Sequence, residues 1–386
     1  MRTIDYNAHN AEVKAVWDAY SQSEPIRVPI VFGINPRFTM EGIEANPRGI
    51  TFKDYSENPQ LMMERQLEHS NWIRHHIPQD AEMGLPADGW SIYVDLQNYY
   101  EAAWLGCDIR YYEGQVPDTE PMLKDDDRKW SVFDRGIPDP FTGGVMRRNW
   151  EFYDYFTMKQ AEGYTDKDRP ITQVSPAGLG TDGPVTIACN LRGATEFMID
   201  LLADTDYALK LLDLITSAII LRICAYREHL DLPMKTAEWG FADDSIQMLS
   251  EAMYRDYIFP FHRRLVETFS EEGPNAIHLC GDSTRHFRFL RDRLNIQSFD
   301  TGYPVDFARL RLDLGPDVEI KGGPSTVLLQ TASPEEVHRE VRRILTSGIT
   351  EGGRFILREG NNLPPGVPLE NIWAMYEAGK EYGCYT

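Results

Sequence analysis

An alternation of short apolar runs with longer amphipathic stretches continues to the end of this sequence, and it limits the accessible folds more than any other feature. The short runs are rich in β-branched and aromatic residues, which is typical of strands. They lie at 27–32, 91–95, 185–188, 236–242, 276–280, 296–300, 318–321 and 355–358. Stretches with helical spacing lie at 58–76, 195–229, 250–271, 283–294, 307–314 and 369–381, and a typical helix start lies at 333–336. Repetition of strand then helix predicts a parallel α/β fold.

The alternation favours a single (β/α)8 TIM barrel over an open sheet. No Gly-rich dinucleotide-binding loop follows the first strand-like run, which disfavours a Rossmann fold. One barrel with insertions accommodates a chain of 386 residues. We therefore predict an N-terminal helical extension at 1–26 and a barrel at 27–386, with an irregular inserted segment around 115–170 that is dense in charged and aromatic residues.

The charge balance and the termini exclude several classes of protein. The chain has 60 Asp and Glu residues against 39 Lys and Arg, a formal net charge of −21. This disfavours nucleic-acid binding, because contacts to phosphates need clustered cations. The N-terminus lacks a signal-peptide core, and no window of about 18 uncharged apolar residues occurs, so we expect a cytoplasmic protein without a membrane partner. The five cysteines are scattered and predict no disulfide framework.

Polar residues concentrate just after the apolar runs. In a parallel barrel the active site lies at the carboxyl ends of the strands, so these positions are the candidates for function. They are Asp95, Glu238, Asp243, Asp244, His278, Cys280, Asp282, Asp300, Lys321, Glu359 and Asn361.

His278 and Cys280 are the most informative pair. They lie two residues apart on a predicted strand, so their side chains point to the same face. An imidazole and a thiolate that converge there are natural ligands of zinc. A core histidine beside a buried cysteine would explain the pair as well, but Gly281 and Asp282 at the strand end favour a site, because glycine allows close backbone approach.

The other candidates have two interpretations each. Asp95, Asp243 and Asp244 suit catalytic carboxylates or a metal ligand, and each also suits a helix cap. Asp300 is expected to orient a histidine or to bind substrate. Lys321 fits either catalysis or an ion pair inside the barrel.

The segment 275–282, Asn-Ala-Ile-His-Leu-Cys-Gly-Asp, resembles the His-x-Cys-Gly segment of the cobamide-dependent methyltransferases, a branch of the uroporphyrinogen decarboxylase superfamily. The motifs at 93–95, 314–323 and 355–375 are similar to others in that superfamily. The resemblance covers about residues 27–380 and implies a (β/α)8 barrel. True decarboxylases carry an early Arg-rich segment that grips substrate carboxylates. The matching stretch here holds only Arg37, so the sequence is more similar to the methyltransferase branch.

That branch binds zinc through the same histidine and cysteine and through a later cysteine. The resemblance therefore implies zinc at His278 and Cys280, but Asn361 stands where the later cysteine would be. We expect a carboxylate to complete the site, with Glu238 as the preferred ligand and Asp243 or Glu359 as alternatives. The expected catalytic residues are Asp95, Asp243 and Asp244, and the expected substrate-binding residues are Asp282, Asp300, Lys321, Glu359 and Asn361.

Three functions remain open at this point. The first is a zinc-dependent methyltransferase that moves a methyl group between a small thiol or methyl ether and a corrinoid protein. The second is a metal-free decarboxylase of a porphyrinogen or another carboxylic acid, with Asp95 as the central carboxylate. The third is a barrel that binds a ligand or a corrinoid protein without catalysis. The oligomeric state is open, a homodimer included.

Overall fold

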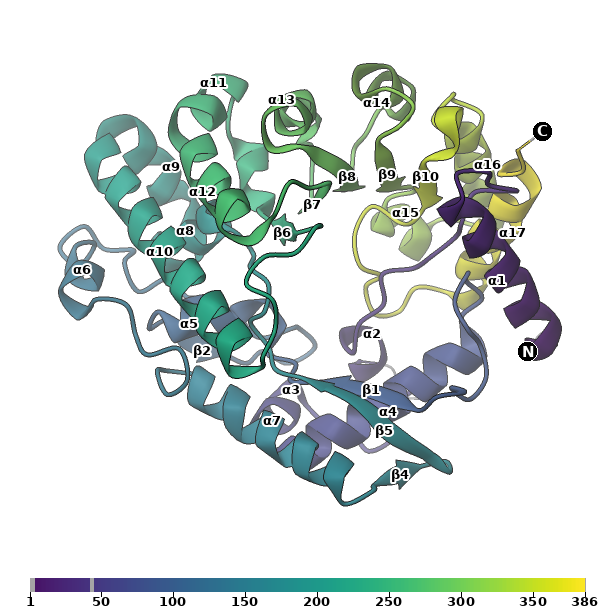
Figure 1. Ribbon diagram of the computed structural model, residues 1–386, viewed down its shortest axis with the longest axis horizontal. Helices are drawn as coiled ribbons and strands as arrows, with labels where there is room; N and C mark the ends of the chain where they lie inside the picture. Colours follow the sequence, from purple (N-terminus) through teal and green to yellow (C-terminus); the bar gives the residue numbers. More distant parts are fainter. Residues whose placement is uncertain (1–3, 42–44, 386) are drawn as a thin grey trace.

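The computed structural model describes residues 4–41 and 45–385. Two sheets curve around a common centre, with helices on their outer side, and their strands are parallel except for β4, which is antiparallel to β5 (Figure 1). A five-stranded sheet has the order β10-β9-β8-β7-β6, a second sheet has the order β1-β5-β4, and β2 pairs with β3. The strands are β1 (Trp90–Tyr93), β2 (Asp108–Arg110), β3 (Asp118–Glu120), β4 (Thr165–Asp166), β5 (Arg169–Ser175), β6 (Gly240–Ala242), β7 (Asn275–Leu279), β8 (Ile296–Thr301), β9 (Glu319–Gly322) and β10 (Phe355–Leu357).

The segments follow one another in the strand order of a TIM barrel. Ile30 forms a parallel bridge with Leu357 of β10, which places the first strand-like run beside the last strand. At the other side of the five-stranded sheet, Ala242 N–H of β6 donates to the carbonyl of Thr181, just beyond β5, at 3.2 Å. Within the described ranges the hydrogen-bonded strands do not join into one closed ring, so the closed (β/α)8 form stays a prediction.

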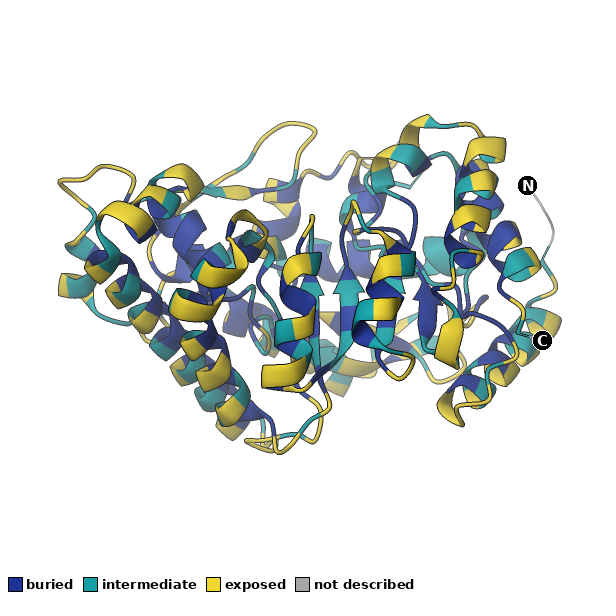
Figure 2. Cartoon of the chain, turned by 90° about the horizontal axis from the view of Figure 1, so that it is seen from above, coloured by how far each residue is buried: buried dark blue, intermediate teal, exposed yellow. Residues whose placement is uncertain are grey.

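Helices cover the outside of the strands. The central strands combine buried and partly buried residues, while the outward faces of the helices are exposed (Figure 2). Up to β6 the helices are α1 (Tyr6–Ser21), α2 (Arg37–Met40), α3 (Phe52–Glu57), α4 (Pro59–His76), η1 (Gln97–Tyr99), α5 (Tyr100–Trp104), α6 (Ser131–Arg135), α7 (Met146–Ala161), α8 (Pro184–Arg192), α9 (Ala194–Ala203) and α10 (Thr205–His229). After β6 they are η2 (Asp244–Met248), α11 (Glu251–Met253), η3 (Tyr254–Ile258), α12 (Phe259–Phe269), α13 (Thr284–Leu294), α14 (Phe307–Leu314), α15 (Thr326–Thr331), α16 (Pro334–Leu345), η4 (Glu351–Gly353) and α17 (Leu369–Tyr382).

The strand β7 shows how the fold presents its polar side chains. Its residues alternate between buried and partly buried, with Ile277 and Leu279 buried and His278 partly buried. Because side chains alternate across a strand, the apolar pair packs against the helical layer while His278 points to the opposite face.

Ion pairs connect the N-terminal helix α1 to the rest of the fold. Glu12 accepts a bond from Arg27 at 2.9 Å and another from Lys380 of α17 at 2.7 Å. Arg27 is itself buried and paired with the buried Asp80 at 2.6 Å. The proposed domain boundary at residue 26 stays a prediction. No helix in the described part of the chain is long and apolar enough to cross a bilayer.

Two expectations about local structure were wrong. The run at 185–188, expected as a strand, lies in the helix α8. Pro184 occupies the first turn of that helix, where its missing N–H is not needed and its fixed φ suits helical geometry. The segment around 115–170 is not uniformly irregular, because it contains the 16-residue helix α7, whose buried side chains include Trp150 and Phe156.

Candidate metal centre

Asp244, His278 and Cys280 come together at the carboxyl end of β7. One potential ligand atom from each residue lies within 4.8 Å of the others. His278 Nε2 and Cys280 Sγ lie 3.2 Å apart, as expected for residues two apart on one strand face. Asp244 reaches them from the first residue of the 3-10 helix η2, which follows the neighbouring strand β6. The centre therefore joins two adjacent strand ends.

His278 is oriented by a carboxylate on the next strand. Its Nδ1 lies 2.9 Å from Oδ2 of Asp300 in β8, the residue opposite it in the parallel register. Arg358, after β10, donates to the same carboxylate oxygen. Burial alone would lower the pKa of His278, but the hydrogen bond and charge of Asp300 outweigh it and raise the pKa overall. With Nδ1 bonded to Asp300, Nε2 is left facing Cys280.

The main chain at Cys280 is bound by Asp244. The N–H of Cys280 donates to Oδ1 of Asp244 at 2.7 Å. Burial, followed by the nearby Asp244 carboxylate, raises the pKa of the Cys280 thiol well above its usual range. The thiol therefore keeps its proton near neutral pH unless a cation joins the site.

Glycines allow the main chain to pack tightly around Cys280. A Cβ on Gly302, in the loop after β8, would lie 2.2 Å from the nitrogen of Gly281 and 2.6 Å from the carbonyl carbon of Cys280. Gly281 has φ +67°, and a Cβ there would meet Oε1 of Gln247 at 1.6 Å. Side chains at these positions would displace the strand end that carries Cys280.

Asp95 is buried just after β1 and is held by its own set of hydrogen bonds. Its oxygens accept from the hydroxyl of Tyr55 at 2.9 Å and from the side-chain amide of Gln97 at 2.7 Å. Burial raises the pKa of Asp95 despite these bonds. Arg37 lies close enough for its charge to act on both Asp95 and Cys280, and its Nε is buried without a partner among the described residues.

Asp243 points away from the three-residue cluster. It is fully buried, and its carboxylate accepts from the N–H groups of Val185 and Thr186 at 3.0 and 2.8 Å and from Thr186 Oγ1 at 2.9 Å. His262 Nε2 lies 2.8 Å from its other side. The Asp243 carboxylate therefore binds the first turn of α8 and His262. Its expected catalytic role stays a prediction.

Glu238 does not reach the centre. The expected strand at 236–242 begins only at Gly240, so Glu238 precedes the strand and lies exposed at its amino end. Active-site residues of such barrels lie at the opposite end. The preference for Glu238 as the third ligand was therefore wrong in placement, and Asp244 occupies that place in the cluster.

Glu359 is fully buried beside Arg358. Its Oε1 accepts from Gly33 N–H at 2.7 Å, and its Oε2 has no partner in the described ranges. Burial raises the pKa of Glu359 to about 8. Asn361 nearby is exposed, and its Oδ1 accepts from the main chain of Asn362.

The two other expected substrate-binding residues have local partners. Lys321 on β9 lies 3.3 Å from Oε1 of Glu319, which is the ion pair weighed against catalysis. Asp282 is exposed and accepts from the hydroxyl of Thr284 at the start of α13. Their roles in substrate binding stay predictions.

Asp182, Arg358 and Arg37 were not among the expected site residues. Burial, followed by the charges of Glu101 and Asp244, raises the pKa of Asp182 to about 8, so this acid lies near the centre. It follows β5, which the sequence analysis did not recognise as a strand. Arg358 ends a predicted strand, a position that could have identified it.

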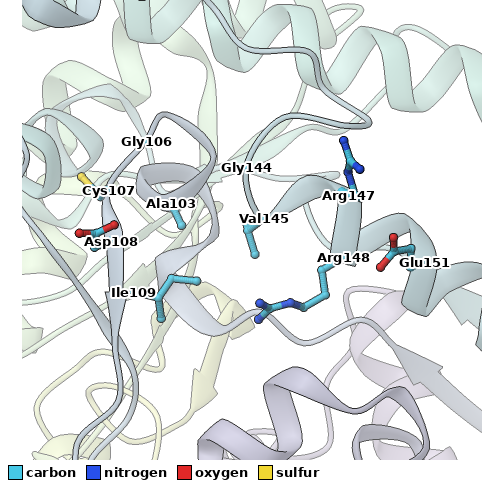
Figure 3. A pocket seen from close by; sticks show the side chains of 10 residues that line it. All are labelled: Ala103, Gly106, Cys107, Asp108, Ile109, Gly144, Val145, Arg147, Arg148 and Glu151. Atoms are coloured by element: carbon cyan, nitrogen blue, oxygen red, sulfur yellow. The ribbon is translucent and has the colours of Figure 1, made fainter.

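A separate cavity of about 540 Å3 lies between β2 and the start of α7 (Figure 3). Arg148 extends into this hollow from α7, opposite Ile109. Its lining, as far as the chain is described, includes no member of the centre. We therefore place the chemistry at the strand ends and not in this cavity.

The donor set of the centre fits a zinc ion. A carboxylate oxygen, an imidazole nitrogen and a thiolate sulfur are its usual protein ligands. Catalytic zinc sites keep three protein ligands and one open position, which matches three residues. The second nitrogen of His278 already has a carboxylate partner, as the histidine ligands of metal sites almost always do.

The fold and the site define an α/β protein that carries a cluster of polar side chains at the carboxyl ends of its parallel strands. Residues 169–382, more than half of the chain, match the family uroporphyrinogen decarboxylase (URO-D). The chain belongs to the uroporphyrinogen decarboxylase family.

Two relatives and one solved structure extend this result. A methylated-thiol–coenzyme M methyltransferase of Methanosarcina mazei is 31% identical over 139 residues, covering 36% of this chain and 35% of that protein. A uroporphyrinogen decarboxylase of Prochlorococcus marinus is 30% identical over 135 residues, covering 34% and 37%. The matched part thus spans little more than a third of either relative. A methyltransferase structure from Methanosarcina mazei superposes with a TM-score of 0.64 at 19% identity, over 96% of this chain and 98% of that one, which shows a common fold.

Proposed function

We propose that the protein is a zinc-dependent methyltransferase that moves a methyl group between a small substrate and a corrinoid protein. The observation that carries the proposal is the convergence of Asp244, His278 and Cys280 within 4.8 Å. The methyltransferase among the relatives supports the reaction class, because its name specifies transfer from a methylated thiol to coenzyme M. A thiol is therefore the substrate class that we favour.

Asp244, His278 and Cys280 would hold the zinc ion. When bound, zinc lowers the pKa of a thiol or hydroxyl group and so provides a nucleophile at neutral pH. The protein's own contribution is to present a neutral Nε2 on His278, which the Asp300 bond at Nδ1 orients. Cys280 must release its proton, and Asp244 is fixed by the main chain of Cys280.

The proposal assigns Asp300 and Arg358 to positioning and not to substrate contact. Asp300 accepts from both His278 and Arg358. Burial raises the pKa of Asp300, but the bond from His278 and the charge of Arg358 outweigh it, so the carboxylate stays ionised. A permanent anion at that place stabilises the imidazole in one orientation.

Free methylcobalamin and coenzyme M provide a direct test. Zinc-loaded protein is mixed with both, and loss of the methyl–cobalt absorbance is followed with formation of methylated thiol. We expect turnover with the native protein, loss of turnover and of stoichiometric zinc in Cys280→Ala, and neither loss in Cys384→Ala. Cys384 is an exposed cysteine far along the chain and serves as the matched control. Absence of zinc from the native protein would overturn the proposal.

A metal-free decarboxylase is the second candidate, favoured by one observation. Asp95 is buried with a raised pKa, and Arg37 lies near it as a cation for a substrate carboxylate. One of the relatives is a uroporphyrinogen decarboxylase. Carbon dioxide release from uroporphyrinogen that Asp95→Asn abolishes and a chelator leaves unchanged would favour this candidate over the first.

A further inference from the structure

A buried hydrogen-bond network lies behind η2, the element that carries Asp244 to the centre. We call it the Tyr254 network and define it as Tyr254, His262, Asp243 and His286. All four side chains are fully buried. None of them can contact a substrate, so any influence they have on the centre passes through other residues.

The first part of the network is a chain of three groups. The Tyr254 hydroxyl lies 3.0 Å from Nδ1 of His262, and Nε2 of His262 lies 2.8 Å from Oδ2 of Asp243. Burial raises the pKa of Tyr254 well above its usual range, so the hydroxyl keeps its proton and donates to Nδ1. His262 then carries its proton on Nε2 and donates to the carboxylate.

A π-helical turn brings the two rings together. Tyr254 begins the π-helix η3, and His262 lies eight residues on, in α12. The wider turn changes the direction in which Tyr254 points relative to a continuous α-helix. Turns of this kind are rare in proteins, and those that occur often lie at functional sites. Here the turn lets the Tyr254 hydroxyl reach the His262 imidazole, and both side chains are fully buried.

Hydrogen bonds anchor the main chain on both sides of Asp244, one through Asp243 of the network and one through Thr186 of α8. Asp243 is fixed by His262 and by the first N–H groups of α8. The N–H of Ser245 donates to Oγ1 of Thr186 at 3.1 Å. Asp244 therefore sits between two anchored neighbours, and its carboxylate direction follows from theirs.

His286 adds a bond further along η2. Its Nε2 donates to the carbonyl of Ile246 at 3.1 Å, and its ring packs against Tyr254 at 4.9 Å between centroids. Burial lowers the pKa of His286 to about 4, so the ring is neutral. Tyr254 thus contacts both histidines that support the element.

We propose that the Tyr254 network sets the metal affinity of the centre by fixing Asp244 in its ligand direction. This inference rests on the proposed function, because it needs a metal at Asp244, His278 and Cys280. Residues of the network are positioning residues and touch neither metal nor substrate. Outer partners of this kind typically change metal affinity by about 10–100-fold.

Zinc and cobalt(II) affinities of matched variants test the inference. Tyr254→Phe removes only the hydroxyl, and Tyr226→Phe removes the hydroxyl of another fully buried tyrosine, which donates to Pro140 C=O at 2.7 Å. We expect about a fivefold rise in the zinc dissociation constant for Tyr254→Phe and no change for Tyr226→Phe. His262→Leu should raise it by about 10–100-fold, and His262→Gln, which keeps a donor toward Asp243, should restore much of the affinity.

The cobalt(II) spectrum and the melting temperature separate positioning from a merely structural role. We expect the ligand-field bands to change in His262→Leu, because the third ligand is displaced. If Tyr254→Phe and His262→Leu lower the melting temperature but leave metal affinity and spectrum as in the native protein, the inference is overturned while the proposed function stands. If the native protein binds no zinc or cobalt, the proposed function fails and the inference fails with it.

Discussion

Nδ1 of His278 lies 2.9 Å from Oδ2 of Asp300, and this one contact decides which nitrogen of the imidazole faces Cys280. The two residues are opposite each other on adjacent parallel strands, so the sheet register creates the pair. Arg358 donates to the same oxygen from the strand end beyond.

Asp300→Asn should weaken zinc binding by about 10–100-fold and lower the pKa of His278. The hydrogen bond to Asp300, followed by the charge of its carboxylate, raises this pKa against the effect of burial. An NMR titration of the histidine and a chelator competition measure the two effects. Asp292→Asn removes a surface partner of Arg291 and should change neither. An unchanged His278 pKa in Asp300→Asn would contradict the assignment.

Asp244→Ala should reduce zinc affinity more than Asn361→Ala does. Asp244 lies within the cluster, whereas Asn361 is exposed and bonded to its own neighbour. Loss of a direct ligand should exceed the roughly 10–100-fold cost of losing an outer partner. Metal content after dialysis against a chelator compares the two variants with Glu238→Ala. Retention of zinc by Asp244→Ala, with loss in Asn361→Ala, would assign the third ligand to the other position.

Zinc affinity should rise with pH, by about tenfold per unit for each proton released. Burial and the Asp244 carboxylate raise the pKa of Cys280 well above its usual range, so its thiol holds a proton that the metal must displace near neutral pH. Calorimetry in buffers of different ionisation enthalpy counts the released protons. We expect at least one per zinc ion, from Cys280. Affinity that does not vary between pH 6 and pH 8 would exclude a thiol ligand.

Glu359→Gln should flatten the dependence of folding stability on pH. Glu359 has a pKa of about 8 in the folded protein and about 4.5 ordinarily, so it retains a proton in the folded state that the unfolded chain releases. Its contribution therefore falls as pH rises from about 4.5 to about 8, by up to about 1.4 kcal/mol per unit. Urea unfolding at several pH values measures the slope. A slope identical in both proteins would show that the carboxyl group ionises normally.

Gly302→Ala should displace Cys280, because the new Cβ would lie 2.2 Å from the nitrogen of Gly281. We expect a loss of folding stability of about 1–3 kcal/mol and weaker zinc binding. Gly180→Ala is the control, since a Cβ there would meet nothing within 4 Å. Thermal melting and zinc competition check both variants. Equal behaviour of the two would mean that the loop after β8 adapts without moving the site.

The sequence predicted the helix at 58–76 and the strands that lead to Cys280 and Asp300, and the structure contains all three. Their spacing patterns are strong because one face of each packs against the core. The strand predicted at 185–188 was wrong, because a short apolar run has the same composition in a buried strand and in a buried helix. Proline and glycine before that run were the signal that favoured the helix.

The pairing of His278 with Cys280 needed only the sequence, because two residues on one strand share a face through local geometry. The third residue of the centre, the orientation of His278 and the network behind Asp244 depended on tertiary structure. Asp244 and Cys280 are 36 positions apart, and the register of β6 against β7 brings them within one hydrogen bond. Local spacing within either strand does not give this register, because two parallel strands are joined by a long crossover connection and pair only when the chain packs.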